Sequence, residues 1–212
     1  MARLEDIHAL GAAKRVEAIS NNPELVRCTF RGENGVTPEQ ARGTFLLQKL
    51  ANILLPGVMP VAHSFGRDEK TGEYYMDVER IALDAKHLAF HDSNEQKYPA
   101  RPPEHNRHEL DYYGLRYSDE IQKMRDIGLT MDNEMGFPID SSYGVNWTLA
   151  ENKLKYLDMG RPWSDNTGSV FYSPIKLNNA IESLQDEEKL TTARALFDEL
   201  QSLAAGRPKK KL

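Results

Sequence analysis

The stretch DSSYGVNWTLAENKLKYLDMGR, residues 140–161, decides the expected fold. Two β-like runs, 147–149 and 154–157, flank a polar turn and predict a short hairpin. The hairpin brings the amide of Asn146, before its first strand, close to the carboxylate of Asp158, just after its second strand. Amide and carboxylate oxygens suit Mg²⁺, which takes the rest of its shell from water and substrate phosphates. We therefore predict that Asn146 and Asp158 form a metal-binding pair.

A simpler interpretation of this hairpin stays open at this point. Asn and Asp side chains routinely bond to nearby backbone groups. Asn146 and Asp158 would then only shape the two ends of a plain β-hairpin.

Upstream of the hairpin, the sequence predicts an antiparallel sheet with one helix. β-like runs cover residues 14–19, 25–30, 60–65 and 74–81 and are separated by turn residues. Between the second and third runs, Thr37-Pro38 is typical of a helix start, and Pro56-Gly57 of a helix end. Downstream, helices are predicted after Ser118 and after Ser173-Pro174, with an apolar stripe from Leu190 to Leu203.

The hairpin motif Leu157-Asp158-Met159-Gly160-Arg161, together with this order of elements, resembles the protein-kinase-like fold over roughly residues 10 to 160. It is most similar to the aminoglycoside phosphotransferase branch, where the returning strand often ends in a motif like Ile-Asp-x-Gly-Arg. The resemblance implies an α+β, two-lobed fold. Residues 1–80 would form an N-terminal antiparallel sheet with one helix and a hinge, and residues 81–212 a reduced, mainly helical lobe.

The resemblance also implies cofactors and a nucleotide site. ATP and Mg²⁺ are the expected cofactors, with Mg²⁺ on Asn146 and Asp158. The segment Tyr74 to Arg80 looks like the hinge that contacts adenine, which assigns Met76, Asp77, Val78 and Glu79 to nucleotide binding. Arg27 falls near the position of the family's phosphate-pairing Lys, although its planar guanidinium is not equivalent to a lysine ammonium.

Several positions depart from the family pattern. Ser141 occupies the place of the catalytic Asp, with Asp140 beside it, and a serine cannot replace that carboxylate without a base of its own. The helix Glu that pairs with the Lys falls near Gly43, with Glu39 one turn away. The turn at residues 10–14 has one glycine where a phosphate-covering loop usually has two or three.

These departures leave two classes of function open. The first is a kinase-like nucleotide-binding protein, which is either an ATP-dependent phosphotransferase with Asp140 or Ser141 as an unusual catalytic residue, or a pseudokinase. The alternative is a non-catalytic binding or scaffold protein that uses the same fold without nucleotide. The sequence does not specify a phosphate acceptor or a protein partner.

A competing metal site would lie in the polar, proline-rich segment 84–109, which we expect to be a long loop. It contains His87, His91, His105 and His108, and imidazoles at such spacings can bind Zn²⁺. The segment has no thiolate, and neither histidine pair encloses the Glu of a zinc-hydrolase helix. Solvated loop histidines are therefore the favoured interpretation.

Composition excludes other classes. The net charge of -5 argues against nucleic acid as a partner, and the basic tail 207–211 is typical of a solvated chain end. No apolar run approaches the roughly 20 residues of a membrane helix, so no membrane partner is expected. The first residues lack a secretory signal, and the single cysteine, Cys28, fits a structural thiol in a reducing compartment. We therefore expect a cytoplasmic protein.

Overall fold

The computed structural model describes residues 14–30, 36–81, 123, 126–139, 147–150, 153–164 and 169–206, with the backbone only for 147–150 and 153. It is an α+β structure, as expected, and its main sheet has four antiparallel strands. These strands are β1 (Lys14–Ile19), β2 (Asn22–Phe30), β3 (Ala62–Arg67) and β4 (Tyr74–Glu79). Within the described residues, the part that follows the sheet consists of helices and one short hairpin.

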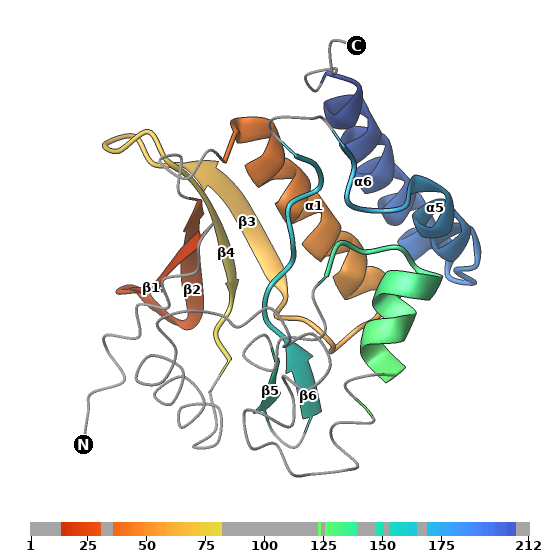
Figure 1. Cartoon of the computed structure of the whole chain (residues 1–212). Coiled ribbons are helices and arrows are strands. Elements are labelled where there is room, and N and C mark those ends of the chain that lie inside the picture. The colour runs from red at the N-terminus through yellow and green to blue at the C-terminus, as the bar shows by residue number, and fades with distance from the viewer. Residues whose placement is uncertain are drawn as a thin grey trace, which may run out of the picture.

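The strand order in the sheet is β1-β2-β4-β3, so β4 is central and β1 and β3 lie at the edges (Figure 1). β2 pairs with β1 on one side and with β4 on the other. Helix α1 and strand β3 are therefore inserted between two strands that are neighbours in the sheet. The chain passes from β2 through α1 to the far edge and returns through β4.

Helix α1 (Pro38–Leu54) begins and ends where the sequence predicts. The Thr37 hydroxyl accepts a hydrogen bond from the Gln40 amide, and the Gln40 side chain accepts one from the Thr37 amide, which together form a capping box. Pro38 fits the first turn because its missing N–H is not needed there. Gly57, with φ of 86°, lets the chain turn away after the helix.

The core lies between the sheet and α1. Alternation along β2 and β4 turns Cys28, Met76 and Val78 toward α1, where they are buried with Leu46 and Leu50. On its other side α1 packs against α6 (Glu187–Ala205), which follows the shorter α5 (Pro174–Glu182) (Figure 1). Arg42 of α1 joins this interface through two hydrogen bonds to Glu199, at 2.7 and 3.0 Å.

A second, two-stranded sheet lies at one end of the main sheet (Figure 1). It consists of β5 (Trp147–Ala150) and β6 (Lys153–Tyr156), which form the predicted hairpin. The Tyr156 amide donates a hydrogen bond of 2.7 Å to the Val58 carbonyl, in the turn between α1 and β3. The hairpin is therefore held to the main sheet next to the start of β3.

The segment before the hairpin contains a wide helical turn. Residues 126–129 are α-helical and continue into the π-helical turn η4 (Thr130–Glu134), where the Met135 amide bonds to the Thr130 carbonyl. Gly136, with φ of 75°, then reverses the chain. Most of the helix expected after Ser118, and the loop expected at 84–109, lie outside the described residues.

Candidate functional site

The motif residue Asp158 contacts a lysine that the sequence analysis did not assign to the site. Lys14 Nζ, at the start of β1, lies 2.6 Å from Asp158 Oδ1 and donates a hydrogen bond of 3.2 Å to the Met159 carbonyl. The Lys14 side chain is 12% exposed and the Asp158 side chain 51%. The structure therefore places a shielded ammonium against a half-exposed carboxylate, directly after the hairpin.

The backbone on both sides of Asp158 is fixed. On one side, β6 pairs with β5 and bonds to the α1–β3 turn through Tyr156. On the other side, the Gly160 amide donates to the Pro138 carbonyl at 3.1 Å. A Cβ at Gly160 would lie 2.1 Å from that oxygen, so a residue without a side chain is required. These constraints hold the Asp158 carboxylate at the start of β1.

The helix position where the family pattern has a Glu cannot hold a side chain here. A Cβ at Gly43 would lie 2.7 Å from Cγ of Pro162 and 3.2 Å from the Trp163 ring. The Gln40 amide group also donates to the Trp163 carbonyl at 2.7 Å. The segment that follows Gly160 therefore fills the space beside α1, and Lys14 contacts Asp158 rather than a helix carboxylate.

Arg27 lies on the face of the sheet that points away from α1. It pairs with Glu17 and Asp77 in the strand register, whereas its neighbour Cys28 points into the core. Its guanidinium donates to both carboxylate oxygens of Asp77, at 2.8 and 3.0 Å, and stacks 3.6 Å from the centre of the Tyr75 ring. The hydrogen bonds to Asp77 raise the pKa of Arg27 further. The structure thus brings Arg27 and Asp77 together and separates Arg27 from the face that carries Lys14.

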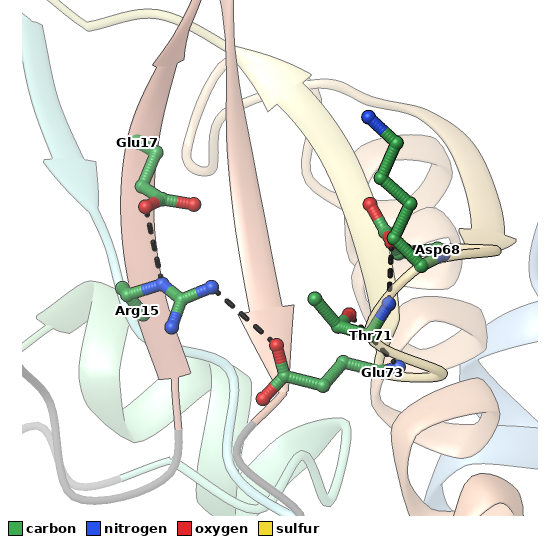
Figure 2. Close-up of polar contacts among 6 residues, drawn as sticks. Arg15, Glu17, Asp68, Thr71 and Glu73 are labelled. Atoms are coloured by element: carbon green, nitrogen blue, oxygen red, sulfur yellow. Dashed lines mark hydrogen bonds and ion pairs between the residues drawn. The ribbon is translucent and has the colours of Figure 1, made fainter.

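This outer face carries a cavity of about 280 Å³ lined mainly by charged and hydroxyl side chains. Figure 2 shows Arg15 between Glu17 and Glu73, with nitrogen to oxygen distances of 3.2 and 3.4 Å. In the turn that walls the cavity, the Asp68 carboxylate accepts hydrogen bonds from the Thr71 and Lys70 amides, which lower the pKa of Asp68. Because Arg15, Glu17, Glu73 and Asp68 already have partners on this surface, we interpret it as stabilising the sheet.

The other residues assigned to nucleotide binding lie in the central strand. Met76 and Val78 are buried in the core, at 2% and 4% exposure. Since β4 pairs with β2 and β3, the backbone of the expected hinge from Tyr74 to Glu79 is already paired in the sheet. Glu79, at the end of β4, accepts a hydrogen bond from the Val61 amide and lies 3.8 Å from Lys155 Nζ of β6. It therefore joins the two sheets.

The remaining assigned residues, Asp140, Ser141 and Asn146, lie outside the described residues, as do the histidines of the alternative zinc site. Asp158 is thus the member of the expected metal pair that the structure places. Within the described ranges, no three His, Cys, Asp or Glu side chains gather into a group that could hold a metal ion.

Lys14 is the functional candidate that sequence reasoning missed, although a signal for it exists. The tight turn at Ser20-Asn21 fixes the β1–β2 register, which places Val16 opposite Cys28 on the core face. Lys14 follows on the same face by alternation. A lysine on the core face of a strand needs a counter-ion, so the position of Lys14 indicates that a carboxylate lies close to it.

Cys28 is buried beside this ion pair and supplies a test of the site's burial. Loss of hydration raises the pKa of its thiol from 9.0 to about 11. As the pH rises, the thiol loses its proton in the unfolded chain before it does so in the folded protein. The contribution of the thiol to the free energy of unfolding is therefore complete below pH 9.0 and falls as the pH rises toward 11. We expect the difference in unfolding free energy between wild type and Cys28→Ala to shrink above pH 9.0 in denaturant titrations. A difference that stays constant up to about pH 11 would contradict the shift.

No model of a known protein family matches the sequence, and no match to a curated protein is found. In the part of the chain that the structure describes, no helix is both long and apolar enough to cross a lipid bilayer.

Proposed function

We propose that this chain is a kinase-like nucleotide-binding protein in which Lys14 and Asp158 form the phosphate and metal site. The observation that carries the proposal is the 2.6 Å contact between Lys14 Nζ and Asp158 Oδ1. It puts a cation suited to phosphate next to a carboxylate suited to Mg²⁺. The order of elements from β1 to β6, with Asp158 directly after a hairpin, supports the same resemblance.

This proposal replaces Arg27 with Lys14 as the phosphate-binding cation. The Arg27 guanidinium is held by Asp77 and Tyr75 on the outer face of the sheet. Lys14 is a compact point charge on a flexible stem and can follow a phosphate that enters beside Asp158. A two-lobed arrangement, with the β5–β6 hairpin belonging to the second lobe, is part of the proposal.

The donor atoms of Asp158 fit Mg²⁺ because they are hard oxygens on a half-exposed side chain. Asp158 would hold the cation together with phosphate oxygens, and Lys14 would bind the phosphates directly. When bound, Mg²⁺ would neutralise phosphate charge. Because Gly43 leaves no helix carboxylate for Lys14, we propose that phosphoryl transfer is slow or absent and that the protein is closer to a pseudokinase.

A scaffold protein without nucleotide is the second candidate, and one observation favours it. Trp163, five residues after Asp158, is 2% exposed and packed against α1. A segment fixed in this way could serve as a permanent structural element rather than as part of a substrate site.

Calorimetry of ATP binding with Mg²⁺ tests the proposed function. We expect Asp158→Ala to weaken Mg·ATP binding roughly tenfold or more, because the variant removes the metal-binding carboxylate. Asp198→Ala, which removes an exposed carboxylate on α6, is the matched control and should bind like wild type. ATP should also raise the melting temperature of the wild type in the presence of Mg²⁺. If ATP does not raise the melting temperature of the wild type and Asp158→Ala does not weaken Mg·ATP binding, the proposal fails and the scaffold candidate is favoured.

A further inference from the structure

The contact between Lys14 and Asp158 occupies the atoms that the proposed function assigns to a metal–nucleotide complex. The Lys14 ammonium lies 2.6 Å from Asp158 Oδ1 and donates to the Met159 carbonyl at 3.2 Å. An ammonium held by these two oxygens has one N–H left for a phosphate. A divalent cation on Oδ1 would also be repelled by the ammonium at that distance. Loading the site therefore requires the two side chains to separate.

The surroundings of Lys14 determine what that separation costs. Its side chain is 12% exposed, and a shielded ammonium needs an opposite charge close by. Among the described carboxylates, Asp158 is the one that contacts Lys14. Gly43 offers none, because Pro162 and Trp163 fill the space beside it. If a cation takes Asp158, Lys14 needs a new anionic partner, which a phosphate would provide.

We propose that Lys14 acts as an internal counter-ion that competes with divalent cations for Asp158, so that a cation binds tightly only when an anion takes over Lys14. This inference rests on the proposed function and concerns the regulation of the same site. It makes cation and nucleotide binding mutually dependent, and each must raise the affinity for the other by the same factor. In the absence of nucleotide, the Lys14–Asp158 pair keeps the site closed to metal.

Mn²⁺ binding without nucleotide tests the competition, with free Mn²⁺ followed by electron paramagnetic resonance. We expect Lys14→Met to bind Mn²⁺ about tenfold more tightly than wild type, a factor typical of coupled sites. The matched control is Lys155→Met, since Lys155 is also 12% exposed but lies beside Glu79, and it should bind like wild type. Adding Asp158→Asn to Lys14→Met should abolish the gain. Equal or weaker Mn²⁺ binding by Lys14→Met would overturn the proposal.

Two further measurements keep the result interpretable. Lys14→Gln retains a donor for the Met159 carbonyl and replaces Lys14→Met if circular dichroism shows that the latter is unfolded. It should show the same gain in Mn²⁺ affinity, and no gain would count against the proposal. ATP titrations of the wild type separate the competition from the proposed function. If the wild type binds ATP but Lys14→Met has no higher Mn²⁺ affinity, the competition alone is refuted. If Lys14→Met has a higher Mn²⁺ affinity but the wild type does not bind ATP, the proposed function alone is refuted.

Discussion

Trp163→Ala is expected to lower the free energy of unfolding by about 4 kcal/mol, in the range for a large buried aromatic side chain. The indole is 2% exposed, and its ring lies next to the backbone of α1 at Gly43. Its removal leaves a cavity that the neighbouring helix cannot fill, since Gly43 has no side chain. The hydrogen bond from the Gln40 side chain to the Trp163 carbonyl would remain, because it uses only the backbone of Trp163, so the loss reports packing.

Denaturant unfolding followed by far-ultraviolet circular dichroism measures this loss. Phe171→Ala is the matched control, because Phe171 lies in the same segment but is 54% exposed. It should change the unfolding free energy by less than about 1 kcal/mol, as for other exposed positions. Similar losses for Trp163→Ala and Phe171→Ala would show that the segment is not packed against α1 as described.

Gly160→Ala is expected to cost about 3 kcal/mol of stability, at the upper end of ordinary overpacking. The added methyl group would lie 2.1 Å from the Pro138 oxygen and 3.2 Å from its carbonyl carbon. Both are backbone atoms, so the clash cannot be relieved by a side-chain rotation. The chain must move, and the hydrogen bond from the Gly160 amide to Pro138 would be strained or lost.

This substitution should also change the candidate site, because Asp158 lies two residues before Gly160. We expect weaker Mg·ATP binding by Gly160→Ala at a temperature where the variant is still folded. Gly206→Ala is the control, since a Cβ there meets its nearest neighbour, the Leu203 carbonyl, at 3.6 Å. Unfolding titrations that give both variants the stability of wild type would contradict the close approach at Pro138.

Together, Trp163 and Gly160 explain why the segment after the hairpin follows one path. Gly160 allows the backbone to approach Pro138, and Trp163 then fills the space beside Gly43. This path brings the chain from the small hairpin to the helix that covers the main sheet. The position of Asp158 thus depends on packing well beyond the motif in which it occurs.

Local signals in the sequence determined most of the secondary structure. The Thr37-Pro38 start and the Pro56-Gly57 end bound α1 because capping and backbone restrictions act within a few residues. The four strands of the main sheet and the hairpin before Asp158 follow from alternation and turn residues for the same reason. The α+β class is therefore confirmed, while the two-lobed kinase-like arrangement stays a proposal.

Only the tertiary structure decided which residues meet. Alternation puts Arg27 and Cys28 on opposite faces of β2, but it does not say which face α1 covers. In the structure α1 covers the face of Cys28, so Arg27 lies on the opposite face and pairs with Asp77. Lys14 and Asp158 lie far apart in the sequence, so no local pattern records their contact. Helix α1 has a glycine at position 43 because Pro162 and Trp163 occupy the space that a side chain would need. Contacts between distant segments depend on how the packed elements fit together, which sequence periodicity does not encode.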